Sequence, residues 1–208
     1  MSGAASTSNG AMPTGCATSD SPIGPIGVSF PDDWVALELH PAERDRFVNR
    51  LVRRQVGAGH AVAPFRRAVE GELRNALREA ADRGAVAAAA LIDVAPELEF
   101  PVLIVNAILS VHAAPSGFDL ADVVADWPQR PGESLTPVDL PCGPAVRIAR
   151  CNEQPLAGSP HSWLLLTSQY FVARPARVVV LQFQTPNLDL ATPLAALFDA
   201  VAATLVIP

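Results

Sequence analysis

The stretch AVAAAALIDVAPELEFPVLIVNAILSV, residues 85–111, contains two long apolar runs that are joined by a short loop over residues 95–101. A loop of this length suits an antiparallel hairpin and is too short for the helical crossover that parallel strands need. The second run is apolar at consecutive positions from Val102 to Val105, so we expect this strand to be covered on both faces. The stretch therefore predicts a hairpin at the centre of a sheet between helical layers.

Three further strands and a closing helix are predicted after this hairpin. The strands are AVRIARC at 145–151, SWLLLTSQYFV at 162–172 and RVVVLQFQT at 177–185. The short turn at 173–176 again requires antiparallel pairing. In the helix at 192–205, Thr192 is the expected N-cap and Phe198 lies on the apolar face, where truncation to Ala should be among the most destabilising single changes.

Before the hairpin, the sequence predicts a turn at Pro31-Asp32-Asp33 between two short strand-like stretches, and then two amphipathic helices. The first helix starts at Pro41 and stops at Gly57, and the second ends at Gly84. After the hairpin, a short amphipathic helix ends at Pro128, and the proline-rich stretch 128–144 is expected to form loop and edge structure.

Together these elements predict an α+β fold: a predominantly antiparallel β-sheet flanked by helices, in an α/β/α sandwich. Residues 26–208 are expected to form a single domain. Residues 1–25 are rich in Ser, Thr, Gly, Ala and Pro, and are expected to be a disordered tail, because they hold too little apolar surface to offset the entropy of ordering.

Composition narrows the class of protein. The net charge of -6 argues against nucleic-acid binding, and the apolar runs are too short to span a membrane. Three widely spaced cysteines fit a reducing compartment, so a soluble, cytoplasmic protein is expected. All 15 basic residues are arginine, which with the abundant Ala, Pro and Val indicates a GC-rich coding sequence and suggests an actinobacterial source.

The chain offers little catalytic chemistry. It lacks a phosphate-binding glycine motif, and its four histidines stand about 20 to 50 residues apart without an HxxxH or CxxC pair. We therefore predict no catalytic, cofactor-binding or metal-binding residues and no cofactor. Cys151 and His161 could meet across neighbouring strands as a Cys-His pair, but a strand cysteine near a loop histidine is the interpretation that we favour.

Two groups of residues are candidates for binding a partner. The densest cationic group consists of Arg53, Arg54, Arg66 and Arg67. Guanidinium groups bind carboxylates bidentately, so these arginines suit an acidic partner. A solvated helix face with local partners such as Glu70 is the alternative, and we favour it.

The second group is aromatic. Trp163 and Tyr170 lie in one predicted strand, where alternation places Trp163 and Phe171 on one face and Tyr170 on the other. Such residues line ligand pockets or, more often, the core. Because they face opposite ways, at least one of them is expected to lie outside the driest layer.

The order of elements resembles the PsbP-like superfamily, which contains photosystem assembly proteins, Ran-binding nuclear transport factors and bacterial Eag-type effector chaperones. The resemblance spans about residues 28–205, and it rests on phrases that recur in the same order: FPDDW at 30–34, the hairpin at 85–111, LADVVADW at 120–127, PCGPAVRIAR at 141–150, VVVLQFQTP at 178–186 and LAALFDAVAATL at 194–205. It implies an antiparallel sheet between helical layers and a role in binding proteins, with no catalytic residues to transfer.

These observations predict a non-catalytic adaptor or chaperone with a protein partner, of the kind that accompanies a bacterial secretion system. Two alternatives stay open. The first is a small-ligand binder or enzyme that uses a pocket between sheet and helix, with Cys151, His161 or Arg147. The second is a structural subunit that self-associates, for example as a homodimer.

Overall fold

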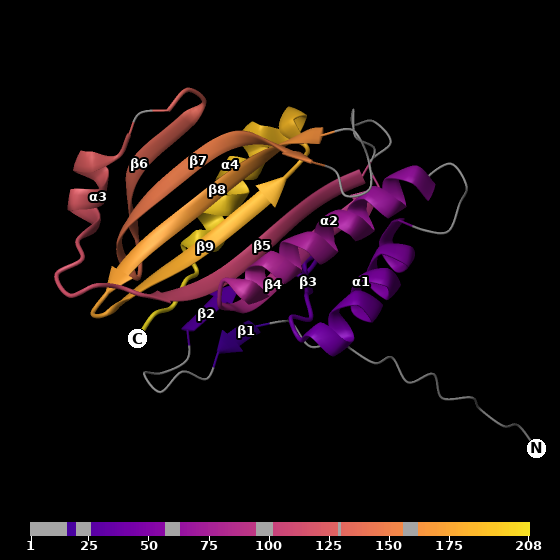
Figure 1. Ribbon diagram of the computed structural model, residues 1–208, viewed down its shortest axis with the longest axis horizontal. Coiled ribbons are helices and arrows are strands. Elements are labelled where there is room, and N and C mark those ends of the chain that lie inside the picture. Colours follow the sequence, from indigo (N-terminus) through magenta and orange to yellow (C-terminus); the bar gives the residue numbers. More distant parts are fainter. Residues whose placement is uncertain (1–15, 20–25, 57–62, 95–101, 129, 156–161) are drawn as a thin grey trace, which may run out of the picture.

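The computed structural model describes residues 16–19, 26–56, 63–94, 102–128, 130–155 and 162–208. Its main feature is a seven-stranded antiparallel sheet in the order β3-β4-β5-β9-β8-β7-β6, and β1 and β2 pair separately (Figure 1). The strands are β1 (Cys16–Ser19), β2 (Ile26–Ser29), β3 (Val35–Ala36), β4 (Ala85–Val94), β5 (Val102–Ala113), β6 (Glu133–Leu140), β7 (Gly143–Pro155), β8 (Ser162–Arg174) and β9 (Arg177–Thr185). The helices are α1 (Pro41–Val56), α2 (Ala63–Asp82), α3 (Leu120–Asp126), the 3-10 turn η1 (Leu188–Leu190) and α4 (Ala191–Ala202). The predicted α+β fold is confirmed.

The hairpin at residues 85–111 lies inside the sheet, as its apolar runs predict. β4 and β5 pair antiparallel over nearly their whole length, and β9 pairs with the other side of β5. Val102, Ile104 and Val105 are fully buried, because β5 has helical cover on one face and the main core on the other. The consecutive apolar positions of β5 thus reflect burial on both faces.

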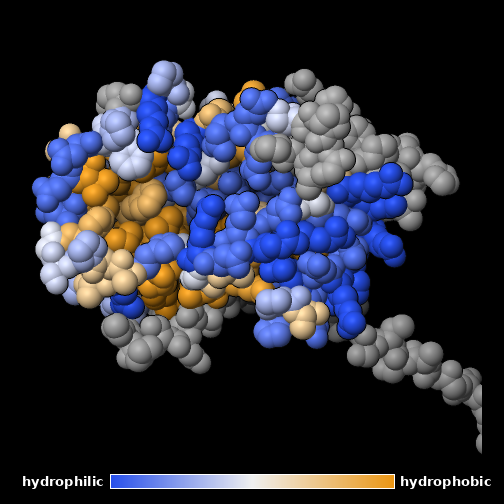
Figure 2. Space-filling view, in the orientation of Figure 1, coloured by the Kyte–Doolittle hydropathy of each residue, from blue (hydrophilic) through white to orange (hydrophobic). Residues whose placement is uncertain are grey.

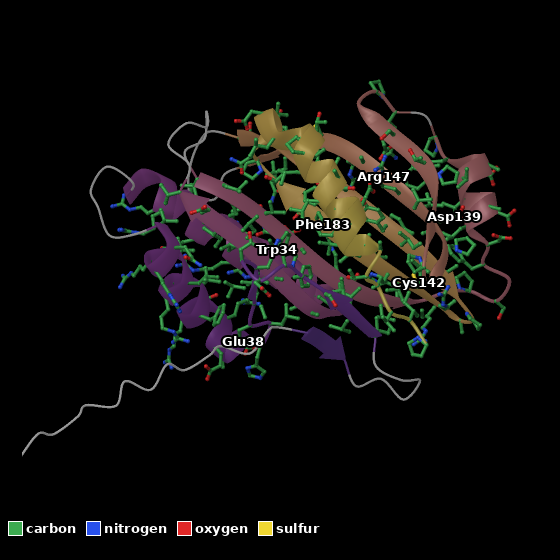
Figure 3. The ribbon with its side chains drawn as sticks, turned by 180° about the vertical axis from the view of Figure 1, so that it is seen from behind. Trp34, Glu38, Asp139, Cys142, Arg147 and Phe183 are labelled. Atoms are coloured by element: carbon green, nitrogen blue, oxygen red, sulfur yellow. The ribbon has the colours of Figure 1, made fainter. Side chains whose placement is uncertain are left out.

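The main core lies between the sheet and α4. Phe183 of β9 stacks on Phe198 of α4, with ring centroids 4.5 Å apart, and meets Trp34 edge-on at 6.3 Å. Seen from behind, α4 crosses the sheet over Phe183, with Trp34 close by (Figure 3). The predicted turn before Trp34 is also present, with the Trp34 amide donating to the Pro31 carbonyl at 3.1 Å.

The opposite face of the sheet carries α1 and α2 over β4 and β5, and α3 over β7 and β8 (Figure 1). Strand register shows that α2 and α3 share this face. Phe171 packs in the α3 cluster and pairs with Val180, which pairs with Ser110 of β5, and Ile108 two residues away packs in the α1–α2 cluster. In the part of the chain that the structure describes, no helix covers β9 between α2 and α3.

Two details differ from the sequence prediction, at the N-terminal tail and at the start of α4. Residues 16–19 of the expected tail form β1, paired with β2, and the rest of 1–25 lies outside the described residues. The proline-rich stretch forms edge structure as expected: its eight-residue strand β6 lies at the sheet edge, where Pro137 is tolerated. Thr192 does not cap α4: the helix starts at Ala191, whose amide donates to the Leu188 carbonyl of the preceding 3-10 turn.

Candidate functional site

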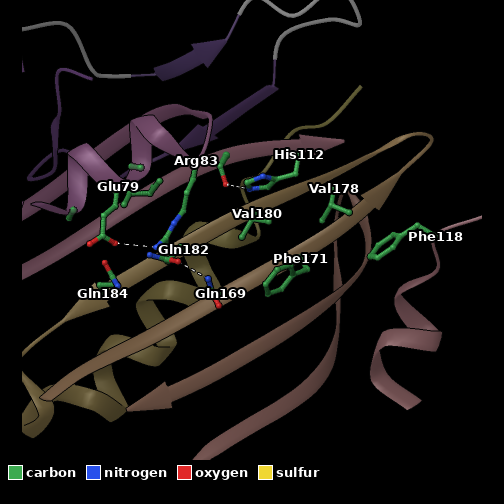
Figure 4. Close-up of a pocket in the computed structure, with 14 residues that line it drawn as sticks. Glu79, Arg83, His112, Phe118, Gln169, Phe171, Val178, Val180, Gln182 and Gln184 are labelled. Carbon is green, nitrogen blue, oxygen red and sulfur yellow. Dashed lines mark hydrogen bonds and ion pairs between the residues drawn. The ribbon is translucent and has the colours of Figure 1, made fainter. Parts of the chain in front are cut away.

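A groove lies on the face of the sheet between α2 and α3, and its cavity volume is about 320 Å³. α2 forms one wall, β5, β9 and β8 form the floor, and Phe118 ahead of α3 closes one end (Figure 4). Its lining residues are Ala76, Glu79, Ala80, Arg83, Ile108, Ser110, His112, Phe118, Gln169, Phe171, Val178, Val180, Gln182 and Gln184. Apolar side chains gather between α2 and α3 on this side of the molecule (Figure 2).

Strand alternation positions the floor of the groove. The odd-numbered residues of β9, such as Leu181 and Phe183, are buried in the core beneath α4, and the even-numbered residues therefore face the groove. Val178 and Val180 form an apolar end, and Gln182 and Gln184 form a polar end. Over residues 179–183, the core face of β9 is therefore fully apolar, whereas its groove face is mixed.

Polar contacts order the side chains of the groove. The Gln169 amide donates to Gln182 Oε1 at 2.6 Å, and the two side chains form a bridge between β8 and β9 (Figure 4). On the wall, Arg83 pairs with Glu79 at 3.3 Å. The groove therefore offers neutral amide groups on its floor and a self-paired ion pair at its rim.

A row of polar side chains crosses the sheet at the polar end of the groove, and we call it the polar row. Cross-strand pairing places one member on each of five strands, in the order Asn106, Gln184, Thr167, Arg150 and Glu133. Asn106 and Thr167 are 4% and 2% exposed. Among the described residues, Asn106 Oδ1 and Thr167 Oγ1 have no hydrogen-bond partner, although buried polar atoms almost always have one.

Glu72 of α2 is a buried acid one helical turn before Ala76, which lines the groove. Its residue is 3% exposed, and one carboxylate oxygen, Oε1, has no hydrogen-bond partner in the described part of the chain. Burial, and secondarily the charge of Glu79, raises the pKa of Glu72 to about 7. The group therefore titrates near neutral pH.

The four arginines predicted as a docking surface lie at the end of the α1–α2 pair that is distant from α3 (Figure 1). Arg53, Arg54 and Arg67 are exposed, whereas Arg66 is half-buried and lies 3.9 Å from Glu70. The pair with Glu70 is the local contact that the alternative interpretation expects. None of the four lines the groove.

Phe171 and Tyr170 lie on opposite faces of the sheet, as strand alternation predicts. Phe171 lines the groove, and Tyr170 points to the opposite face, where it is 1% exposed and donates a hydrogen bond to Asp199. Tyr170 is therefore a core residue, and its prediction as a partner-binding residue is wrong because α4 covers it. Trp163 belongs to β8, but its side chain lies outside the described residues.

Two of the three residues proposed for an enzyme, Cys151 and Arg147, fall in the described part of the chain. Cys151 is an exposed residue of β7, and His161 lies outside the described residues. Arg147 faces α4 instead of the groove and holds the Asp199 carboxylate with two contacts of 2.9 Å. Within the described ranges, no group of three or more His, Cys, Asp or Glu side chains forms a metal site.

Sequence reasoning missed the glutamines of the groove and the buried Glu72. The available signal was the alternation of Gln182 and Gln184 with apolar residues. In a central strand, polar side chains on one face indicate that no helix covers that face. Glu72 had no comparable signal, because its burial depends on elements far away in the sequence.

Comparisons with known proteins yield no family assignment. No protein-family model and no curated protein matches the sequence. A solved structure of a Pseudomonas aeruginosa protein of unknown function matches with 22% identity and a TM-score of 0.38, covering 50% of this chain and 74% of that one. LpqN, which is involved in cell envelope biogenesis of Mycobacterium tuberculosis, matches with 14% identity and a TM-score of 0.43, covering 90% of this chain and 86% of that one.

None of the helices that the structure describes has the length and apolar character to cross a membrane.

Proposed function

We propose that this protein is a non-catalytic adaptor or chaperone, and that its groove holds an apolar helical segment of a protein partner. The observation that carries the proposal is the uncovered stretch of sheet between α2 and α3. Helices cover the sheet on either side of it, whereas Phe171, Val178 and Val180 line an open groove. Concave apolar surfaces of this kind mark interaction sites.

The width of the groove suits one helix. The floor is formed by three adjacent strands, β5, β9 and β8, which span two inter-strand spacings, or about 10 Å. An α-helix with its side chains has a diameter of about 10 Å. A helix from a partner would therefore complete the helical layer by packing its apolar face into the groove.

The floor of the groove and the nearby helix α3 indicate which polar features the partner would have. Gln169, Gln182 and Gln184 provide neutral amide groups that donate and accept hydrogen bonds without the desolvation cost of a charge. α3, which follows Phe118 at one end of the groove, carries exposed Asp122 and Asp126 and no basic residue. The partner that fits is thus apolar on the face that enters the groove and basic on its flank towards α3.

The resemblance to PsbP-like proteins supports this proposal at the level of function class, since that superfamily includes effector chaperones. A role beside a secretion system is the finer form of the proposal. It adds a source for the partner: an apolar segment of a secreted protein, which the groove would shield from water before delivery.

Site-specific photo-crosslinking tests the proposal. A benzoylphenylalanine in place of Gln182 lies on the groove floor, and the same group in place of exposed Ser134 lies on the opposite face of β6. We expect crosslinks to one protein from position 182 and not from 134, with the adduct mapping to an apolar helical segment. Equal crosslinking at the two positions, or none at 182, would contradict the proposal.

A charge placed in the groove provides the matched variant. Gln182→Glu keeps an oxygen that accepts the hydrogen bond from Gln169, yet adds a charge that an apolar helix would have to desolvate. With the crosslinker in place of Phe171, this variant should lose the adduct, whereas Ser134→Glu should retain it. An adduct that persists in Gln182→Glu would place the partner elsewhere.

A small apolar ligand is the second candidate, and the cavity volume of about 320 Å³ favours it, since ligand pockets begin at roughly this size. Native mass spectrometry separates the candidates. A bound small molecule adds a discrete mass to the monomer, whereas a self-associating subunit gives a crosslinked dimer from position 182.

A further inference from the structure

We propose that α1 presents a docking surface for an acidic helical segment of a protein partner. The surface consists of Arg46, Arg50, Arg53 and Arg54, and we call it the arginine stripe. The acidic side chains of the partner would lie three and four residues apart along one helix face. No residue of α1 lines the groove, so this inference does not depend on the proposed function.

Helical spacing places the four arginines on one side of α1. Arg50 and Arg54 follow Arg46 by four and eight residues, and residues with this spacing are neighbours on a helix surface. Arg53 lies three residues after Arg50, beside the same row. All four are exposed. The stripe therefore faces solvent over about 12 Å of helix. The buried apolar residues of α1 lie on the other side of the helix, at Val48, Leu51, Val52 and Val56.

The described part of the chain supplies no acidic partner for the arginine stripe. None of its four guanidinium groups lies within ion-pair distance of a described acidic side chain. The neighbouring acids have other partners. Asp45 lies 3.5 Å from Arg44, and Glu70 lies 3.9 Å from Arg66 and 3.4 Å from Arg74. The charge of the stripe is therefore left for another molecule.

The spacing of the arginines disfavours the helix that carries them, because like charges three or four residues apart repel each other. Arg53 and Arg54 have a structural reason, since the last turn of a helix favours cations, but Arg46 and Arg50 lie before that turn. Glu43, one turn before Arg46, makes no ion pair among the described residues. A local arrangement that lowers stability without a compensating contact is typical of a functional surface.

The charge of the rest of the chain favours a short acidic segment as the partner. Since the whole chain carries −6 and the stripe contributes +4, the remainder carries −10. A nucleic acid reaches beyond a stripe of about 12 Å and meets that negative remainder, whereas one face of a helix can match the length of the stripe. Guanidinium groups bind carboxylates bidentately, and acids four residues apart on a helix repeat at the spacing of the stripe.

Fluorescence anisotropy with the full chain tests this surface. The first probe is a labelled, stapled helical peptide that carries glutamates three and four residues apart along one face. The second has the same composition, with its glutamates spread around the helix, and the third is single-stranded DNA of the same charge. We expect saturable binding of the first peptide that weakens as salt is added, and weaker binding of the other two probes.

Variants locate the binding on α1. Arg46→Gln combined with Arg50→Gln should weaken binding of the first peptide about tenfold, as the loss of two exposed ion pairs predicts. The double variant should unfold at no lower denaturant concentration than wild type, because it relieves repulsion. Arg130→Gln makes the same chemical change at an exposed position just before β6 and should leave the affinity unchanged.

Four results would overturn the docking surface: no binding of the first peptide, equal affinity for the two peptides, tighter binding of the DNA, or unchanged affinity in the double variant. Tighter binding of the DNA would assign the stripe to a nucleic acid. Crosslinking from position 182 reports on the groove and not on α1, so either proposal can fail while the other holds.

Discussion

Tyr170 of β8 and Asp199 of α4 are joined by a hydrogen bond of 2.6 Å, in which the buried Tyr170 hydroxyl donates to the carboxylate. Arg147 of β7 holds the same carboxylate at 2.9 Å. The bond links the sheet to the helix that covers its main core. The hydroxyl of Tyr170 thereby has a hydrogen-bond partner in the core. The ring of Tyr170 packs edge-on against Phe183, with ring centroids 6.0 Å apart.

The first prediction concerns the titration of Tyr170. Burial, and then the hydrogen bond and charge of Asp199, raise the pKa of Tyr170 above the ordinary value of 10.0. Stability from this group is complete below pH 10.0 and is lost as the pH rises above that value, because only the unfolded chain readily ionises. Tyr170 is the single tyrosine, so tyrosinate absorbance should appear only together with alkaline unfolding.

Asp199→Ala checks the cause. The variant should lower the pH at which tyrosinate appears and should cost about 1–3 kcal/mol at neutral pH, because it leaves a buried hydroxyl unpaired. Asp139→Ala, at an exposed edge-strand position, serves as the control. Tyrosinate that forms near pH 10 in the folded wild-type protein would contradict the assignment.

The second prediction concerns Phe198. Its side chain is fully buried and stacks on Phe183, so Phe198→Ala should reduce the free energy of unfolding by about 3–5 kcal/mol in a urea titration. Val206→Ala, at a residue that is 61% exposed, should change it little. A Phe198→Ala midpoint equal to that of wild type would show that α4 does not pack on the sheet.

The third prediction concerns Glu72 and pH. Because its folded-state pKa is raised from 4.5 to about 7, its contribution to stability is complete below pH 4.5 and is lost as the pH rises through 7. The difference corresponds to about 3 kcal/mol. Relative to wild type, Glu72→Gln should therefore gain stability between pH 4.5 and pH 8, as measured by denaturant unfolding. A constant difference across this range would place the carboxylate in water.

The fourth prediction concerns Asn187, which is 1% exposed and satisfies the backbone at the start of β5. Its Oδ1 accepts from the Ile104 amide at 3.0 Å, and its Nδ2 donates to the Val102 carbonyl at 3.1 Å. Asn187→Ala should cost at least about 2 kcal/mol, because two buried backbone groups lose their partners.

Asn187→Asp and Asn152→Ala refine this measurement. The aspartate keeps the acceptor for Ile104 and loses the donor to Val102, so its cost should differ from that of alanine. Asn152 is half-buried, and its Oδ1 has no partner among the described residues, so Asn152→Ala should be nearly neutral. If Asn187→Ala unfolds at the same urea concentration as Asn152→Ala, hydrogen bonding by Asn187 does not stabilise β5.

Local patterns predicted the elements that form from neighbouring residues. The apolar runs at 85–94 and 102–111 became the central hairpin, and the stripe around Phe198 became the helix over the core. Thr192 shows the limit of such reasoning. Its residue type suits a cap, but α4 already begins at Ala191, whose amide donates to the Leu188 carbonyl of the preceding 3-10 turn.

The groove could not be predicted in the same way, because its lining comes from α2, β5, β8 and β9. Gln169 and Gln182 are 13 residues apart and meet only across a hairpin, and Glu79 belongs to a helix about 100 residues earlier. Tyr170 and Phe171 are adjacent in sequence, yet one is in the core and the other in the groove, because the covers on the two sheet faces differ.

The sequence by itself determined the class of fold, since apolar periodicity and turn residues act over a few neighbouring positions and specify which segments become strands and helices. Only the tertiary structure decided where β9 is left without a helix on the groove face and which polar side chains, such as Glu72, Asn106 and Thr167, become buried. Burial and unpaired hydrogen-bonding groups are properties of contacts between distant segments, so the candidate site exists only once the sheet and its helices have assembled.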